Sequence, residues 1–172
     1  PMAAGSLSFA PSPDFHGPTS FSYTVNAGGV TETATVSVNV NPLNDAPVPV
    51  APSPSPSGQT FDPESGHYAA NTAEDTPFEG RVAAEDVDGD TLTYSLTTAP
   101  SHGTVTPDAA TGAYTYTPTA DYHGTDSFEV TASDGNGGSV SSTVDMTVTS
   151  VVDIADDTKS TDEGTPVGID VL

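Results

Sequence analysis

The fold class can be predicted from one segment, Ala84-Glu85-Asp86-Val87-Asp88-Gly89-Asp90-Thr91-Leu92-Thr93-Tyr94. Its second half alternates apolar Leu92 and Tyr94 with threonine, which is the pattern of a strand with one buried face. Its first half spaces three aspartates two residues apart around Gly89, a residue typical of turns. In locally extended backbone such side chains point the same way. The stretch therefore predicts a loop of clustered carboxylates that leads into a half-buried strand.

Similar alternation recurs along the chain, and long windows of helical periodicity are absent. The alternating runs are separated by turn pairs such as Asp134-Gly135. Many short strands at this spacing are typical of an antiparallel sandwich. We expect a first strand that carries Glu74, and six more at residues 81–84, 91–97, 103–106, 113–117, 126–132 and 139–149. The sequence thus predicts an all-β, antiparallel β-sandwich.

The charge balance excludes several classes of partner. The chain has 24 Asp and Glu against two Lys and Arg, a formal net charge of −22. Nucleic acids and anionic membrane surfaces attract basic side chains, so neither is expected as a partner. No apolar stretch reaches the length of a membrane span, so direct membrane insertion is not expected. With no Cys, disulfides and thiolate zinc sites are excluded. So many carboxylates do predict a counter-ion, because they repel one another in a compact state.

Internal repetition defines the organisation of the chain. Ten residues between Gly5 and Phe21 recur 107 positions later, between Gly112 and Phe128, and an apolar run at 36–40 recurs at 144–148. This period is close to the length of one immunoglobulin-like sandwich. We interpret the chain as a window of a tandem array. Its parts are the end of a preceding repeat (1–45), a complete repeat (46–152) and the start of a following repeat (153–172).

A Pro/Ser-rich insertion, at about residues 48–70, lies before Glu74 in the complete repeat. From Asp45 to Glu74 is 29 residues, whereas the corresponding distance from Asp153 to Glu163 is ten. The composition predicts an extended segment with few internal hydrogen bonds. Two interpretations stay open. The insertion is a solvated loop or spacer, or it is a protruding binding loop whose bulky tips are Phe61, His67 and Tyr68.

Four segments in a fixed order resemble the cadherin-like tandem repeats of large bacterial surface adhesins. They are Asn44-Asp45-Ala46-Pro47, Glu74-Asp75-Thr76-Pro77, residues 84–94, and Val130-Thr131-Ala132-Ser133-Asp134-Gly135. The resemblance, of the RTX-adhesin type, covers essentially the whole chain outside the insertion. It implies a secreted or cell-surface protein whose repeats hold calcium where one repeat meets the next. The implied function is a calcium-rigidified extender in cell adhesion or biofilm formation.

The chemistry of the residues independently permits calcium, a hard cation that binds roughly six to eight oxygens. The expected strand order places acidic residues at opposite poles of the sandwich. At the top pole we expect Asn44, Asp45, Asp86, Asp88, Asp90 and Asp134. At the bottom pole we expect Glu74, Asp121, Asp126 and Asp153. All ten are candidate Ca²⁺ ligands, against the alternative that acidic loops only make turns and keep the surface soluble.

The partial first repeat departs from this pattern. Thr19 stands at the position of Asp126, and Asn26 at that of Asp134. We therefore expect a poorer metal site at the first junction.

The sequence offers no catalytic constellation, and we expect no enzyme. The four histidines form no pair at metal-ligand spacing, no Gly-x-Ser-x-Gly motif is present, and the absence of Trp argues against a sugar-stacking cleft. Expected partners are the neighbouring repeats of the same chain and a cell-surface glycan or protein. Two alternative functions stay open. One is a module that binds a glycan or peptide, and the other is a non-catalytic accessory domain of a large secreted enzyme or toxin.

Overall fold

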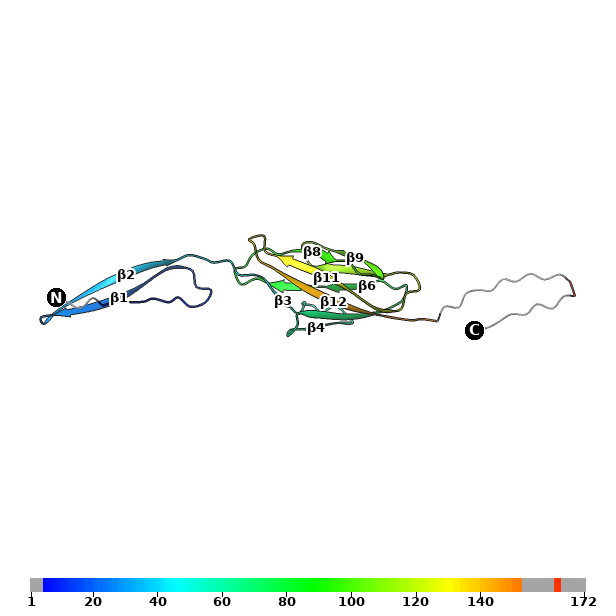
Figure 1. The fold of residues 1–172 in the computed structure, drawn as a ribbon, viewed down its shortest axis with the longest axis horizontal. Coiled ribbons are helices and arrows are strands. Elements are labelled where there is room, and N and C mark those ends of the chain that lie inside the picture. Colours follow the sequence, from blue (N-terminus) through cyan, green and yellow to red (C-terminus); the bar gives the residue numbers. More distant parts are fainter. Residues whose placement is uncertain (1–4, 153–162, 165–172) are drawn as a thin grey trace.

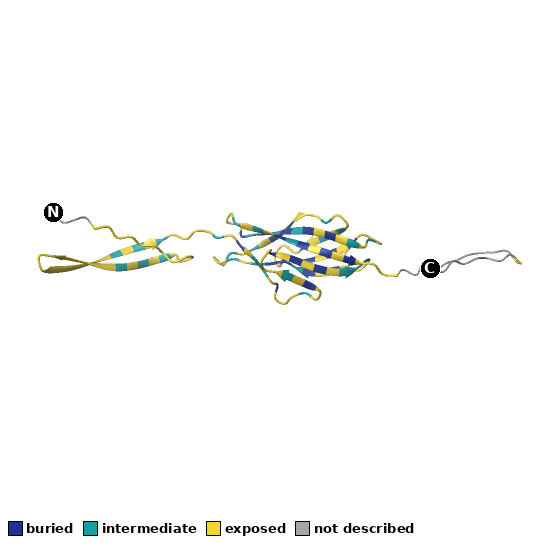
Figure 2. Cartoon of the chain, turned by 60° about the horizontal axis from the view of Figure 1, so that its bottom comes forward, coloured by how far each residue is buried: buried dark blue, intermediate teal, exposed yellow. Residues whose placement is uncertain are grey.

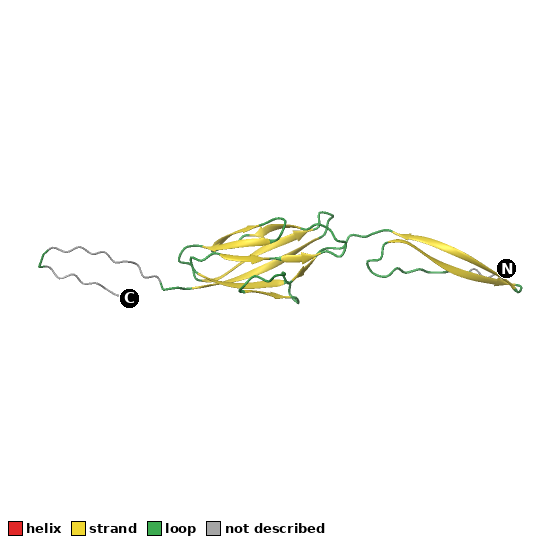
Figure 3. Cartoon of the chain, turned by 180° about the vertical axis from the view of Figure 1, so that it is seen from behind, coloured by secondary structure: helices red, strands yellow, loops and turns green. Residues whose placement is uncertain are grey.

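The computed structural model describes residues 5–152 and 163–164. The described residues form strands and loops without a helix (Figure 3), so this part of the chain contains no helix able to cross a membrane. The strands are β1 (Gly17–Ala27), β2 (Val30–Val40), β3 (Val48–Val50), β4 (Gln59–Asp62), β5 (His67–Ala73), β6 (Phe78–Arg81), β7 (Ala83–Glu85), β8 (Thr93–Thr98), β9 (Gly103–Pro107), β10 (Ala113–Pro118), β11 (Gly124–Ser133) and β12 (Ser139–Thr149). The all-β prediction is confirmed.

Strands β3 to β12 build a sandwich (Figure 1). One sheet has the order β4-β5-β12-β11-β8, the second has the order β6-β10-β9, and β3 pairs with β7 beside them. Neighbouring strands are antiparallel except β5 and β12, which run parallel over six register pairs. The antiparallel sandwich is therefore confirmed, with one parallel pairing in it.

The core lies between the two sheets and follows from the alternation in the sequence. On β11 and β12 the buried side chains include Phe128, Val130, Val144 and Met146, with Glu129 and Asp145 between them on the outer face. The ring of Tyr116 from β10 stacks on that of Phe128, with centroids 6.2 Å apart and planes at 8°. Such stacking adds to the burial of apolar area that stabilises the sandwich.

Some strand boundaries differ from the predicted ones. The expected strand at 81–84 is divided into β6 and β7, because its first part pairs with β10 and its second part with β3. The strand expected at 91–97 begins only at Thr93, and Glu74 follows β5 directly. Partner changes of this kind depend on contacts distant in the sequence, which alternation does not reveal.

The insertion contributes β3, β4 and the start of β5 to the sandwich, so the solvated-spacer interpretation fits only the irregular residues between these strands. Strand β4 becomes the edge of the five-stranded sheet by pairing with β5. Tyr68 has 0% exposure, so it is not a protruding tip. Its hydroxyl lies 2.7 Å from the carbonyl oxygen of Val50 on β3 and accepts a hydrogen bond of 3.0 Å from the N–H of Ala83 on β7. Tyr68 thereby joins β5 to the paired strands β3 and β7.

Gln59, at the start of β4, fastens the insertion to the edge of the second sheet. Its Nε2 donates to the carbonyl oxygen of Arg81 at 2.6 Å, and its Oε1 accepts from the Arg81 N–H at 3.0 Å. The same Oε1 accepts a hydrogen bond of 3.1 Å from the buried Tyr114 hydroxyl. A side-chain amide therefore pairs with the main chain of β6 as a neighbouring strand would.

Replacing Gln59 by alanine is expected to destabilise the sandwich by about 1–3 kcal/mol, because partly buried groups of Arg81 and Tyr114 lose their partners. Urea unfolding followed by tyrosine fluorescence measures this difference. Ser57→Ala is the matched control, since Ser57 is exposed on the same insertion. Equal unfolding midpoints for both variants would contradict the role assigned to Gln59.

Strands β1 and β2 form a separate hairpin, joined to the sandwich by an extended segment (Figure 1) and largely exposed (Figure 2). Phe9 stacks on Phe21 with centroids 6.1 Å apart and planes at 12°. These residues lie 107 positions before Tyr116 and Phe128, whose rings stack in almost the same way. The hairpin thus reproduces the local geometry of β11, with its aromatic partner, outside a two-sheet core.

Candidate metal centre

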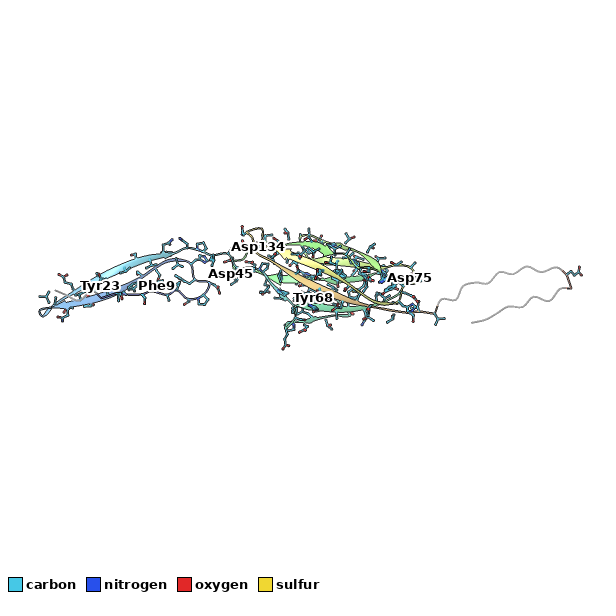
Figure 4. All side chains as sticks on the ribbon, viewed as in Figure 1. Phe9, Tyr23, Asp45, Tyr68, Asp75 and Asp134 are labelled. Atoms are coloured by element: carbon cyan, nitrogen blue, oxygen red, sulfur yellow. The ribbon has the colours of Figure 1, made fainter. Side chains whose placement is uncertain are left out.

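Three loops meet at the end of the sandwich that faces the hairpin, which we call the top pole. They are the segment between β2 and β3, the β7–β8 loop and the β11–β12 loop, and Figure 4 shows Asp45 and Asp134 together at this end. Carboxylate oxygens of Asp86, Asp90 and Asp134 lie within 4.8 Å of one another. Three of the predicted candidate ligands are therefore close enough to share one cation.

Asp86 shapes the β7–β8 loop and leaves one oxygen without a partner. Its Oδ1 accepts hydrogen bonds from the N–H of Asp88 at 2.9 Å and of Asp90 at 3.4 Å. Its Oδ2 is buried and makes no hydrogen bond. Burying a charged oxygen without a partner is costly, and such groups are rare in folded proteins. A cation beside this oxygen would remove that cost.

Asp134 is only 5% exposed, and its side chain is held by three donors. Oδ1 accepts from the N–H of Asn136 at 2.7 Å and of Gly138 at 2.9 Å, and Oδ2 accepts from Nδ2 of Asn44 at 2.8 Å. The Asn44 hydrogen bond, followed by those from the β11–β12 loop, holds the pKa of Asp134 below its usual value. Asp134 is therefore ionised at neutral pH, beside two further carboxylates.

The segment between hairpin and sandwich is tied to this cluster by hydrogen bonds. The N–H of Asp45 donates to Oδ2 of Asp88 at 2.8 Å, across 43 positions of sequence, and the Asn44–Asp134 bond spans 90. The structure thus brings all six residues predicted for the top pole to one region, where Asn44, Asp45 and Asp88 link the loops.

Two residues of the top pole were missed by the sequence analysis. Asn136 donates from Nδ2 to Oδ2 of Asp90 at 2.8 Å. At Gly138 an added Cβ would overlap the carboxylate of Asp134 and would lie 2.8 Å from Cα of Ala46. Both residues belong to the run of Gly and Asn after Asp134. This run predicts a turn but does not indicate these contacts.

The hairpin adds Asp14 to this junction. A cavity of about 310 Å³ is lined by residues of both parts, among them Asp14, Asp45 and Asp88. Asp14 lies 107 positions before Asp121, a predicted bottom-pole residue. Asn26 pairs with Thr31 near the β1–β2 turn, at the end of the hairpin away from Val40 and the junction. The expectation that Asn26 weakens the first junction is therefore wrong, because Asn26 lies at the opposite pole of its own repeat.

The bottom pole brings fewer of the predicted residues together. Glu74 is 5% exposed; its Oε1 accepts from the N–H of Val151 at 2.6 Å, and its Oε2 lies 3.7 Å from Nδ1 of His123. The N–H of Asp121 donates to Oδ1 of Asp75 at 3.2 Å. Asp75, missed as a candidate, lies at the end of the sandwich opposite Asp134 (Figure 4). Asp153 lies outside the described residues.

Asp126 does not point toward a site at the bottom pole. Its Oδ1 accepts hydrogen bonds from the N–H groups of Ser101 and Ser127, each at 2.9 Å. Its Oδ2 accepts from the His102 N–H at 2.9 Å and from the Tyr116 hydroxyl at 3.0 Å. Four donors fill the acceptor capacity of one carboxylate. We therefore correct the prediction for Asp126, which is a structural carboxylate that fastens the β8–β9 loop to the core.

The donor set of the top pole is made of oxygen, mainly from carboxylates. Such ligands suit a hard divalent cation, and loops of several carboxylates with nearby carbonyl groups are typical of calcium. Arg81 is the one Lys or Arg among the described residues, and its guanidinium donates to the carbonyl oxygens of Thr111 and Ser53. The buried Oδ2 of Asp86, which has no hydrogen-bond partner among the described residues, fits an added cation.

Comparisons with known proteins match this architecture. A family model described as "Bacterial cadherin-like domain" matches residues 61–150, and one described as "Bacterial Ig domain" matches residues 2–39. No curated protein is significantly similar to the chain.

Among solved structures, extracellular cadherin domains 1–5 of protocadherin gamma B2 align with 77% of this chain and 25% of theirs, at 19% identity and a TM-score of 0.51. Drosophila N-cadherin EC1–3 aligns with 70% of this chain and 41% of its own, at 16% identity and a TM-score of 0.45. An endo-fucoidan hydrolase of glycoside hydrolase family 107 aligns with 80% of this chain and 19% of its own, at 17% identity and a TM-score of 0.43.

At these identities the likeness to protocadherin shows the fold alone, and the chain spans only a small part of the solved proteins. Bacterial cadherin-like and immunoglobulin-like domains are typical of surface and adhesion proteins, and cadherin-like domains are generally non-catalytic. Cadherin-like domains also typically bind Ca²⁺.

Proposed function

Because this chain belongs to the bacterial cadherin-like domain family, we propose that it is a calcium-rigidified extender of a secreted or cell-surface adhesin that acts in cell adhesion or biofilm formation. The observation that supports this proposal most is the top pole. There, three carboxylates converge, and one of their oxygens is buried without a partner, beside the segment that links the hairpin to the sandwich.

Asp86, Asp90 and Asp134 would hold the ion, together with Asp45 and Asp88 from the linked loops. Calcium, when bound, supplies positive charge that offsets the repulsion among the carboxylates. Asn44 and the N–H of Asp45 keep the linking segment against the two acidic loops, so this segment becomes part of the same oxygen cluster. The side chain of Asp14 adds a carboxylate from the hairpin side of the junction cavity.

The path of the chain through the sandwich supports a role as a spacer. The chain enters the sandwich at β3, at the end that faces the hairpin, and leaves it after β12 at the opposite end (Figure 1). Repeats joined in this way follow one another end to end, and the linking segment contributes to the angle between them. A metal that fixes the linking segment would therefore fix the direction of the whole array.

Spin labels on either side of the junction test this function. The chain has no cysteine, so Glu32→Cys on β2 and Ser95→Cys on β8, both exposed, can be labelled specifically. Pulsed electron paramagnetic resonance is expected to show a broad distance distribution in chelator and one narrow peak with calcium. The same labelled chain with both Asp86→Asn and Asp134→Asn should give the broad distance distribution in calcium and in chelator. If the labelled chain without these two substitutions gave distributions of equal width in calcium and in chelator, the proposed rigidification would be contradicted.

A further inference from the structure

Strand β6 is at the edge of the three-stranded sheet, and part of this edge is open. The order β6-β10-β9 leaves one side of β6 without a neighbouring strand. Gln59 covers that side only at Arg81, where it bonds both main-chain groups. In an antiparallel sheet, alternate residues direct their N–H and C=O to the same side, so the main chain of Glu79 faces the open side as well. The structure pairs no described segment with Glu79 there.

A groove begins beside this edge and extends across β6 and β10 to the end of β9. It has a volume of about 900 Å³, and its two walls are the insertion at 54–57 and strands β6 and β10 with the end of β9. Its apolar lining includes four rigid prolines: Pro54, Pro56, Pro77 and Pro107. The wall at 54–57 is fixed by Gln59 and by the hydrogen bond from Arg81 Nη1 to the carbonyl oxygen of Ser53. The groove is therefore built by the insertion against the sheet edge.

The charged groups in the groove are acidic. They are Glu79, which is exposed, and Asp108. The Oδ1 of Asp108 accepts hydrogen bonds from Ala110 and Thr111, and none of these bonds involves its Oδ2. The hydrogen bond from the Thr111 side chain has the largest effect on the pKa of Asp108 and, together with that from the Thr111 N–H, lowers it, so Asp108 stays ionised. Arg81, the nearby cation, is directed to Thr111 and Ser53. A second copy of this chain, with net charge −22, would be repelled.

We propose that this groove binds an extended basic segment of a partner protein, which adds a strand to the open edge of β6. In this arrangement the partner exchanges main-chain hydrogen bonds with Glu79, as the Gln59 amide does with Arg81. Residues that share such hydrogen bonds lie opposite each other with side chains on the same face. The partner therefore places a Lys or Arg opposite the exposed carboxylate of Glu79, and cross-strand pairs of opposite charge stabilise a sheet.

The peptide Thr-Lys-Val-Lys-Val-Lys-Thr, acetylated and amidated, tests the proposal by nuclear magnetic resonance titration of the full chain. The expected result is saturable shifts of the Glu79 and Gly80 amide signals, equal in calcium and in chelator. This equality separates the groove from the acidic top pole and hence from the proposed calcium function. Shifts centred on Asp86 and Asp134, or equal shifts with Thr-Glu-Val-Glu-Val-Glu-Thr or maltohexaose, would overturn the proposal.

Two further comparisons separate charge from strand pairing. Glu79→Gln is expected to weaken binding about two- to fivefold. Asp108→Asn, at the end of β9 on the far side of β10, and Glu64→Gln, an exposed acid on the β4–β5 turn, should leave the affinity nearly unchanged. The same peptide methylated on the main-chain nitrogen of each lysine keeps its charge but lacks the N–H groups that pair with β6. It should bind about fivefold more weakly. Unchanged affinity in either comparison would contradict the added-strand arrangement.

Discussion

Removal of calcium is expected to lower the melting temperature of the sandwich by roughly 10–20 °C. A ligand that binds only the folded state at a hundredfold excess over its Kd stabilises that state by about 2.7 kcal/mol. For a domain of roughly one hundred residues, each kcal/mol changes the midpoint by about 4–8 °C. The physical origin is the top pole, where Asp86, Asp90 and Asp134 lie within 4.8 Å and repel one another without a cation. Differential scanning calorimetry in calcium and in chelator measures the shift.

The substitutions Asp86→Asn and Asp134→Asn should each remove most of this shift. Each replaces a carboxylate by an amide of the same size, so the packing changes little. Asp108→Ala is the control, because Asp108 is acidic and exposed and its side chain accepts hydrogen bonds only from Ala110 and Thr111 of the β9–β10 loop. The calcium-induced shift of this variant should equal that of the unsubstituted chain. The same melting temperature with and without calcium would exclude a metal role for the top pole.

Replacing Asp126 by alanine is expected to destabilise the sandwich by about 3–5 kcal/mol. The change leaves the N–H groups of Ser101, His102 and Ser127 and the hydroxyl of Tyr116 without their acceptor. The Tyr116 ring is fully buried and stacks on Phe128, so water reaches its hydroxyl poorly. Chemical denaturation in chelator gives the free energy of unfolding without any contribution from bound metal.

The control for Asp126→Ala is Asp145→Ala, an exposed acid on the neighbouring strand β12 that lies 3.7 Å from His67. Exposed pairs of this kind contribute little, so its cost should stay within about 1 kcal/mol. The calcium-induced shift in melting temperature should survive in Asp126→Ala, although the whole curve moves to lower temperature. A variant of normal stability that loses the calcium shift would restore Asp126 as a metal ligand.

The alternation of apolar residues was sufficient to predict β8 to β12 closely, because each of these strands buries one face against the same core. The candidate metal ligands were harder to predict. Asp126 stands in phase with Phe128 and Val130, and this phase indicates an inward side chain that the sequence analysis overlooked. Asn26 was assigned to the wrong junction, because two repeats meet through opposite poles and equivalent loops of successive repeats lie one domain length apart.

The insertion could not be interpreted from its composition. Prolines and serines predict an extended solvated chain, and 51–58 is indeed irregular. Gln59 and Tyr68 are nevertheless buried, because Gln59 bonds the main chain of β6 at Arg81 and Tyr68 bonds that of β3 at Val50. Those groups come from positions far apart in the sequence, so composition gives no sign of them.

Local alternation, turn residues and the number of charges were sufficient to predict the all-β class and the acidic loops. Which carboxylates lie together depends on the folded chain. Asn44 bonds Asp134 across 90 positions of sequence, and Asp126 points into the core although other acidic residues stand near it in the sequence. The physical reason is that a side chain's direction follows from the phase of its strand and from the partners that long-range packing brings to it, and a linear pattern of charge contains neither.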